Sequence, residues 1–306
     1  MALYDQLEAA KEKREKRRDR LVAVSFQRLN QPVDDEEIFH KDVRFTFDHL
    51  PRLTTRPVHI KQLRQTILNL AVRGKLVPQD PNELSNRCHP DFDTRKQLPF
   101  VAPDSWAWGH ISELSDLVTD GEHATPERIT EHEVPLVTAK NVRDGEMDYS
   151  VTDWVSFKTA EKAWRRCRPI AGDILLVCVG ATTGRLCILR EAKDMVLVRS
   201  VALIRPSSAV DIEYMALAIR SPLGQSQIWN SVKTTAQPCL YINRINSLTF
   251  PLPPLGEQRR IVTKVDELMG LCSQLEAQLT STETDSRLLL ETILHEALIP
   301  APQEVA

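Results

Sequence analysis

The stretch Pro251-Leu-Pro-Pro-Leu-Gly-Glu-Gln-Arg-Arg-Ile-Val262 introduces the longest helical pattern in the chain. Beyond its prolines, apolar residues recur in alternating steps of four and three: Ile261, Val265, Leu268, Cys272, Leu275 and Leu279. This is the heptad spacing of a helix that buries one narrow seam against another helix. We therefore predict a long helix over about 255–298, roughly 65 Å long if unbroken, which sets a distance and performs no chemistry.

A second helix is predicted over 58–72, because Ile60, Leu63, Ile67 and Leu70 fall on one face. Gly74 is suited to end it in a left-handed cap, and the helix is too short to be stable without a docking partner. The C-terminal helix is the expected partner. Its seam weakens at Thr282 and Ser286, so we expect a turn or a change of partner near 280–286, with the final turns beside 58–72.

The rest of the chain predicts a compact α+β domain over about 99–250, with a mainly antiparallel sheet. Residues 1–25 are expected to form a charged helix, 30–57 to hold little regular structure, and 79–98 to form a linker. Strands are expected at 134–137, 174–179, 186–189 and 195–204, a turn at 180–184, and helices at 211–220 and 222–232. The predicted domains are 1–57, 58–98, 99–253 and 254–306.

Composition indicates a soluble globular protein, with 42% apolar and 26% charged residues among 306. The apolar runs are too short to cross a bilayer, and the N-terminus lacks a signal-peptide core. The six cysteines form no CxxC pair and the eight histidines no metal-ligand pattern, so we expect a reduced, cytoplasmic protein without a metal.

Charge is distributed unevenly along a chain of net charge −3. Residues 11–20 carry seven basic and three acidic side chains, and 158–168 carry five basic and one acidic. Such clusters on a near-neutral chain are typical of proteins that contact phosphate with one face, although each alone is as often a solvated helix face.

No motif in the sequence indicates catalysis. The turn at 180–184 lacks the spacing and the Lys-Ser/Thr of a phosphate loop, and Pro253-Pro254 lacks the amide of an adenine methyltransferase motif. Asp120, Glu122 and His123, with Lys140 further on, are a weak candidate for a nuclease metal site and fit a solvated loop better. We expect no catalytic residue and no cofactor in this chain.

Binding of DNA is better supported, because polar, basic and aromatic side chains gather in segments expected to be loops. The candidates are Lys140, Asn141, Arg143, Trp164, Arg165, Arg166, Arg168, Thr182, Thr183, Arg185, Lys233, Gln237, Tyr241, Asn243 and Arg244. Arginine reaches phosphates and guanine edges, and asparagine pairs with adenine.

Several segments resemble the specificity subunits of type I restriction–modification systems. Residues 252–269, Leu-Pro-Pro-Leu-Gly-Glu-Gln-Arg-Arg-Ile-Val-Thr-Lys-Val-Asp-Glu-Leu-Met, resemble the passage from a target-recognition domain into a spacer helix. Residues 63–81 resemble the region leading into such a domain, and 172–185 and 221–225 resemble segments within it. Together these segments cover residues 58–298.

The resemblance implies a non-catalytic subunit that reads part of a bipartite DNA site and docks methyltransferase subunits. S-adenosylmethionine, ATP and magnesium would then belong to the methyltransferase and restriction subunits. The family carries two recognition domains in tandem and this sequence has one, so we expect either a half-subunit that dimerises or a truncated product. The seam residues of both helices would form the partner interface.

Two other functions stay open at this point. One is a coiled-coil adaptor that binds protein without DNA, and the other is an enzyme such as a nuclease fused to its reader.

Overall fold

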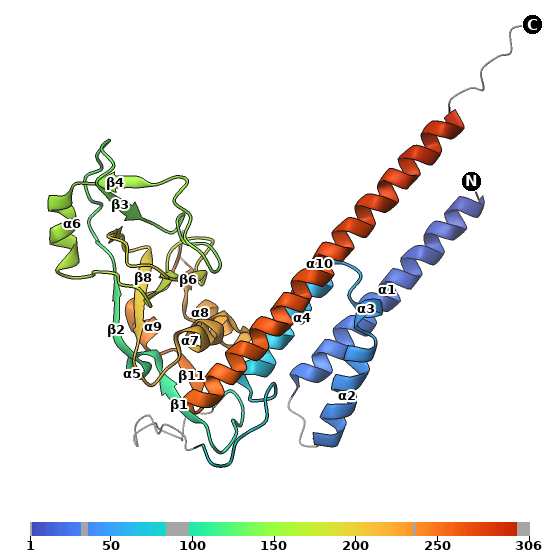
Figure 1. The fold of residues 1–306 in the computed structure, drawn as a ribbon, viewed down its shortest axis with the longest axis horizontal. Helices are drawn as coiled ribbons and strands as arrows, with labels where there is room; N and C mark the ends of the chain where they lie inside the picture. The colour runs from blue at the N-terminus through green and yellow to red at the C-terminus, as the bar shows by residue number, and fades with distance from the viewer. Residues whose placement is uncertain (1, 32–35, 84–97, 235–236, 299–306) are drawn as a thin grey trace, which may run out of the picture. The chain divides into compact units, whose positions relative to one another are not determined.

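The computed structural model describes residues 2–31, 36–83, 98–234 and 237–298. The chain divides into two compact units (Figure 1): a helical unit of residues 1–67 and 266–306, and a sheet unit of residues 68–265. The boundary falls within helices α4 (Pro57–Val72) and α10 (Leu255–Leu298), so each of these helices contributes residues to both units. The predicted four-part division stays a prediction.

Three further helices build the helical unit: α1 (Ala2–Asn30), α2 (Glu36–Asp48) and α3 (Leu50–Leu53). The C-terminal part of α1 buries Val22, Phe26 and Leu29. The expectation of little regular structure over 30–57 is wrong in the described residues. Pro51 lies in the first turn of α3 and Pro57 begins α4, positions where a proline costs no helical hydrogen bond.

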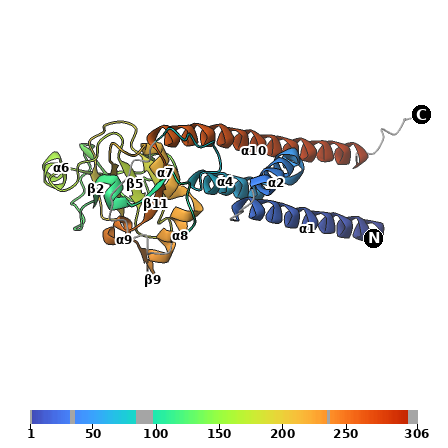
Figure 2. The ribbon, with the colours of Figure 1, turned by 90° about the horizontal axis from the view of Figure 1, so that it is seen from below.

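Helices α4 and α10 lie alongside each other within the helical unit, as predicted (Figures 1 and 2). Arg64 of α4 donates to Ser273 Oγ at 3.1 Å and forms an ion pair with Glu276 at 2.9 Å, both on α10. The predicted seam residues Ile60, Leu63 and Ile67 of α4 and Cys272 of α10 are buried, and Leu268, Leu275 and Leu279 are half-buried.

Helix α10 is unbroken, so the expected turn or partner change near 280–286 is wrong. Every described side chain from 280 to 293 is exposed, which also contradicts packing of the final turns beside 58–72. Threonine hydroxyls in this segment donate to the carbonyl four residues earlier, as Thr280 does to Glu276 and Thr284 to Thr280. Polar residues on the heptad seam therefore end its burial without ending the helix.

The sheet unit is mainly antiparallel, as predicted. A four-stranded sheet of order β2-β8-β5-β6 is antiparallel throughout, and a three-stranded sheet of order β4-β3-β7 has one parallel pair, β3 with β7. The strands are β1 (Ala107–His110), β2 (Ser115–Asp120), β3 (Val134–Val137), β4 (Asp153–Val155), β5 (Ile174–Val177), β6 (Leu186–Ile188), β7 (Val196–Leu197), β8 (Val201–Pro206), β9 (Lys233–Thr234), β10 (Pro238–Cys239) and β11 (Thr249–Leu252). The single strand predicted over 195–204 is two, β7 and β8, separated by residues 198–200.

Short helices complete this unit: α5 (Ile111–Leu114), α6 (Phe157–Trp164), α7 (Ile212–Arg220), α8 (Pro222–Ser231) and α9 (Ile242–Asn246). Local signals fix several of their ends. The Asp211 carboxylate accepts from the first backbone amides of α7, and the Ser221 hydroxyl accepts from Gly224 N in α8, where Pro222 occupies the first turn. Gly74 has φ 69° just after α4, and Lys75 N donates to Leu70 O at 3.0 Å, which confirms the left-handed cap.

The Pro-Pro-Leu-Gly-Glu-Gln segment anchors the first turn of α10 in the sheet unit. Gln258 is fully buried. Its side-chain Oε1 accepts from Asp211 N at 2.7 Å, and its Nε2 donates to Pro253 O at 2.9 Å. The buried Glu257 carboxylate accepts from Trp106 Nε1 at 2.9 Å and from Gln79 Nε2 at 2.8 Å. These bonds join three segments distant in sequence to the first turn of α10 within the sheet unit.

Candidate nucleic-acid interface

One end of the four-stranded sheet collects loops that carry four of the predicted DNA-binding residues, Lys140, Thr182, Thr183 and Arg185. The antiparallel register places the ends of β2 and β5 beside the starts of β8 and β6, since Asp120 is opposite Ala202 and Val177 is opposite Val201. We call this end the loop edge, comprising residues 120–123, 138–140, 178–185 and 198–200. Backbone bonds join these loops, including Arg199 N to Glu122 O at 3.0 Å and Cys178 N to Ser200 O at 2.8 Å.

Two more bonds hold this region together, one within the loop edge and one to a neighbouring hairpin. Ala139 N donates to Ser200 Oγ at 3.3 Å, which brings Lys140 beside the 198–200 loop. The hairpin of β9 and β10 docks on the 178–185 turn, because Gly180 N donates to Pro238 O at 3.0 Å. The predicted residues Lys140, Thr182, Arg185 and Gln237 therefore lie in segments that are joined here, although they are up to a hundred positions apart in the sequence.

Close packing of the loop edge depends on Gly121. A Cβ at this position would stand 2.1 Å from the Leu197 backbone, which no side chain can occupy without moving the chain. The missing side chain allows β2 to reach the end of β7, where Glu122 N donates to Leu197 O at 2.8 Å.

Arg166 is held at the loop edge by acidic and imidazole groups. Its guanidinium donates to Asp120 Oδ1 at 2.5 Å and lies 3.0 Å from His123 Nε2. Arg166 is about half exposed, whereas Asp120 is 14% exposed. Asp120 therefore orients a guanidinium whose side chain stays about half exposed. Arg165, the next residue along the chain, is exposed and makes no side-chain hydrogen bond or ion pair with the described residues.

Two predicted cations are paired within the protein. Arg143 donates to Asp148 through Nε at 3.1 Å and NH2 at 3.0 Å. The hydrogen bonds from Ser150 and from Arg143 lower the pKa of Asp148 to about 2. Lys140 Nζ lies 3.1 Å from Asp153, which Arg128 also approaches. These exposed pairs are weak, so phosphate can compete for either cation.

Three predicted contact residues make hydrogen bonds that serve the fold, and burial of Asn141 and Thr183 is at odds with contact to DNA. Asn141 is fully buried; its oxygen accepts from Thr138 N at 2.9 Å and its amide donates to Asp148 O at 3.0 Å, so it cannot reach a base. Thr183 is buried and donates to Gly180 O at 2.8 Å within its own turn. Trp164 Nε1 donates to Met195 O at 2.9 Å, which ties α6 to the residue before β7.

The remaining candidates are more dispersed. The Arg168 guanidinium lies 4.8 Å from the centre of the Trp164 ring. Tyr241 is exposed and follows Leu240, whose amide donates to Cys178 O at the loop edge. Asn243 and Arg244 are exposed on α9. Leu248, just after this helix, accepts a hydrogen bond through its carbonyl from Ile111 N, which lies near the end of β2 opposite the loop edge. The backbone of Lys233 pairs with Cys239, and its side chain lies outside the description.

Sequence reasoning missed Arg199. This residue lies in the loop between β7 and β8, is exposed, and has no ion pair or side-chain hydrogen bond among the described residues. The apolar residues on both sides suggested one continuous strand, which concealed the loop. The only available signal was the polar pair Arg199-Ser200 within that run.

Three cysteine thiols of the described chain are buried in the sheet unit. Burial raises the pKa of the Cys167 and Cys178 thiols to about 12 and that of Cys187 to about 11, so these thiols are poor nucleophiles at neutral pH. No group of three or more His, Cys, Asp and Glu side chains is arranged to hold a metal in the described ranges. Nor do those ranges contain a helix whose apolar stretch could cross a membrane.

Comparison with protein families gives one match over most of the sheet unit. The family described as type I restriction modification DNA specificity domain matches residues 109–282. Among curated proteins, the EcoAI type I restriction enzyme specificity subunit of Escherichia coli is 30% identical, over 77% of this chain and 44% of its own length. The EcoEI specificity subunit of the same species is 32% identical, over 77% of this chain and 43% of its length. The chain thus spans less than half of these relatives.

Solved structures show the same fold. A structure from a study of complex assembly and conformational transition of the type I R-M system aligns with a TM-score of 0.57 at 19% identity, over 92% of this chain and 58% of that chain. The HsdS subunit from Thermoanaerobacter tengcongensis aligns with a TM-score of 0.53, also at 19% identity and with the same coverage.

Proposed function

The chain belongs to the family of type I restriction modification DNA specificity domains, and on this premise we propose that it is the DNA-recognition subunit of a type I restriction–modification complex. It reads part of a bipartite site in double-stranded DNA. The observation that carries the proposal is the loop edge, where Asp120 holds the half-exposed Arg166 and Arg199 is exposed in the loop between β7 and β8. Guanidinium groups are the commonest readers of guanine edges and also neutralise phosphates.

The division of labour we propose leaves catalysis to other polypeptides. Methyltransferase subunits would carry S-adenosylmethionine and methylate adenine, and a restriction subunit would use ATP and magnesium to cleave DNA. The complex would act in the cytoplasm. A protein-binding adaptor without DNA contact is not favoured, because every curated relative named above is a specificity subunit.

The seam of α4 and α10 supplies the spacer in this proposal. The predicted interface residues, Ile60, Leu63, Ile67, Leu70, Ile261, Val265, Leu268, Cys272, Leu275 and Leu279, are buried or half-buried within the chain itself. They would hold the spacer together, which leaves the surfaces around the seam to receive methyltransferase subunits or a second copy.

Selection of duplexes from a random pool by the full-length chain tests the proposal. Sequencing of the bound fraction is expected to yield a short enriched motif. In the Arg165→Ala/Arg166→Ala variant the enrichment should fall, since a lost bidentate base contact costs about 1–3 kcal/mol of discrimination. Its affinity should also decline less steeply with salt, because fewer counterions are released on binding.

A matched variant controls for the loss of two positive charges. Lys61 and Arg259 are also exposed, and Lys61→Ala/Arg259→Ala should retain the enriched motif. If wild-type protein enriches no motif, alone or with its methyltransferase, base reading by this chain is refuted. Equal loss of the motif in both variants would refute the assignment to the loop edge.

A further inference from the structure

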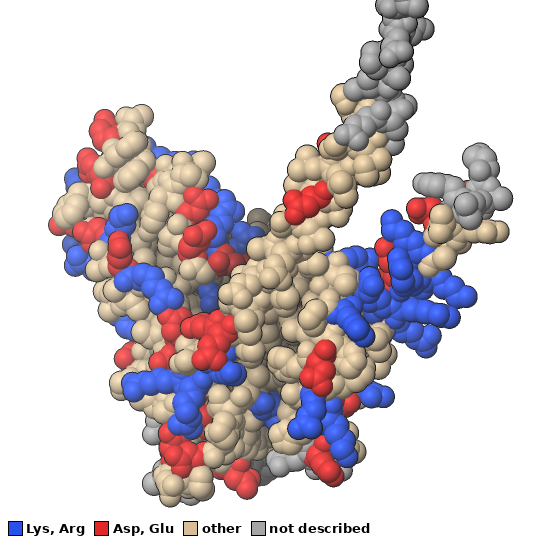
Figure 3. All heavy atoms as spheres, turned by 45° about the vertical axis from the view of Figure 1, so that its right-hand side comes forward, with Lys and Arg blue, Asp and Glu red and all other residues tan. Residues whose placement is uncertain are grey.

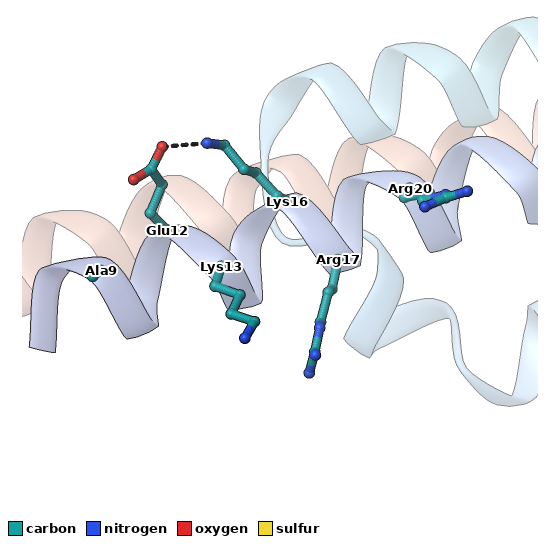
Figure 4. A pocket seen from close by; sticks show the side chains of 6 residues that line it. All are labelled: Ala9, Glu12, Lys13, Lys16, Arg17 and Arg20. Carbon is teal, nitrogen blue, oxygen red and sulfur yellow. Dashed lines mark ion pairs between the residues drawn. The ribbon is translucent and has the colours of Figure 1, made fainter. Parts of the chain in front are cut away.

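Helix α1 carries a basic face that the proposed base reading does not use. Within residues 11–20, seven side chains are basic. At about 3.6 residues per turn, Lys13, Lys16, Arg17 and Arg20 fall on the side opposite the buried Val22. All four are exposed, and together with Ala9 and Glu12 they line a shallow hollow (Figure 4). Figure 3 shows Lys and Arg side chains over much of the visible surface of this helix.

Acidic side chains lie on a separate stripe of the same helix. Glu8, Glu12, Glu15 and Asp19 repeat at steps of four, three and four, along the flank between the basic face and the buried side. Glu12 pairs with Lys16 at 2.5 Å, while Asp19 is engaged by Arg56 and by His59, 3.1 Å away. Lys13, Arg17 and Arg20 have no acidic partner among the described residues. In Figure 4, Lys13 and Arg17 point away from the Glu12–Lys16 pair.

The direction of this face is set by the packing of the helix. Phe26 and Leu29 are buried on the opposite side, and Arg18 donates to Thr55 at 3.3 Å. Together with the bonds of Asp19, these contacts fix the rotation of α1 within the helical unit. The basic face is therefore presented to solvent by the fold.

The chemistry of the face fits phosphate better than a protein surface. Protein interfaces are centred on buried aromatic or aliphatic anchors and are depleted in lysine. Between positions 9 and 20 the basic face has no large apolar residue. Cations without an apolar centre bind by neutralising phosphates and releasing counterions, which needs no particular base sequence.

We propose that this face of α1 binds the phosphate backbone of double-stranded DNA outside the bases that are read. The contact adds affinity without sequence preference. It goes beyond the proposed function and involves a different unit of the chain. Its success or failure is therefore separable from that of the loop edge.

The test measures binding of full-length protein to a duplex of arbitrary sequence over a series of salt concentrations. The variant is Lys13→Gln/Arg17→Gln/Arg20→Gln, which keeps good helix formers at exposed positions. We expect at least roughly tenfold weaker binding at low salt, and a salt slope smaller by about 0.9 for each lost phosphate contact. Sequence discrimination in the pool selection should persist.

The matched control removes three exposed cations elsewhere, as Lys41→Gln/Arg52→Gln/Arg287→Gln, and should change the slope much less. The proposal would be overturned if wild type and the α1 variant had equal slopes of affinity against salt. It would also be overturned if the α1 variant and the control variant lost equal affinity for duplex DNA. An α1 variant that binds duplex normally but no longer associates with the methyltransferase subunit would overturn it as well, and would assign the face to an acidic protein. If the α1 variant weakens binding while wild type enriches no motif, phosphate binding stands and base reading fails.

Discussion

At the scale of single residues, Glu257 and Gln258 explain why the Pro-rich stretch carries polar residues at buried positions. Each makes hydrogen bonds to segments distant in sequence: Glu257 to Trp106 and Gln79, and Gln258 to Asp211. A buried polar side chain is stable only when its bonds are satisfied, so these two residues specify one arrangement of the segments.

Glu257 also predicts a pH dependence of stability. Burial raises the pKa of its carboxyl above the ordinary 4.5, so the folded protein binds this proton more tightly than the unfolded chain does. The resulting stabilisation is complete below pH 4.5 and is lost as pH rises through the raised value. Glu257→Gln should remove this loss of folding stability with rising pH. Chemical unfolding at a series of pH values measures it, with the slope against pH as the readout.

Glu83→Gln provides a control of opposite sign. Arg260 donates to both oxygens of Glu83 at 2.8 Å and lowers the pKa of this carboxyl. That stabilisation is present above pH 4.5 and is lost as pH falls through the lowered value. Relative to Glu83→Gln, wild type should therefore gain stability as pH rises. If both variants changed the slope in the same direction, the environment assigned to Glu257 would be wrong.

At the scale of elements, α10 shows that a heptad seam and a helix can end at different places. Burial along the seam stops near Leu279, while the helix continues to Leu298. The exposed continuation carries threonines that bond to its own backbone and includes Leu289 and Ile293. Its helicity rests on local bonds more than on packing.

Continuity through this segment can be tested with Thr282→Pro. A proline inside an unbroken helix removes a hydrogen bond and clashes with the preceding turn, at a cost of about 3 kcal/mol. The remaining C-terminal turns are then short enough to be marginal in water. We expect a clear loss of helical signal in far-UV circular dichroism, and none in Thr282→Ala. An unchanged spectrum in the proline variant would indicate that the helix is already interrupted there.

At the scale of the whole molecule, the proposed function requires partners. Leu288, Leu289, Leu290 and Ile293 are each more than half exposed on one segment of α10. Exposed apolar residues concentrated in this way are typical of association surfaces. A two-fold pair of such chains would read a palindromic, interrupted site.

Mass measurement in solution tests this prediction, with the full chain alone and with its methyltransferase subunit. The 34.8 kDa chain is expected to appear as a dimer or within a larger complex. Leu289→Gln/Ile293→Gln should shift the mass toward the monomer, whereas Ser286→Gln on the same helix should not. A strict monomer under both conditions would contradict association.

Much of the fold follows from short-range patterns. The bounds of α10, the cap at Gly74 and the runs of β3, β5 and β6 were all predictable, because helix period, proline placement and strand composition act over a few residues. The family was likewise visible in residues 252–269. Of the candidate site, the exposed cations Arg165 and Arg166 were predictable as a basic cluster.

The remaining features depend on contacts between distant segments, which no local pattern contains. Only the tertiary structure buries Asn141 among its neighbours and divides 195–204, which places Arg199 in the loop edge. It also brings the Asp120 carboxylate within hydrogen-bonding distance of Arg166. The sequence by itself determined the long helix α10, the cap at Gly74 and the strands β3, β5 and β6, because hydrogen bonding and side-chain period are local. The folded chain decided which polar side chains face solvent, because burial depends on what packs against them.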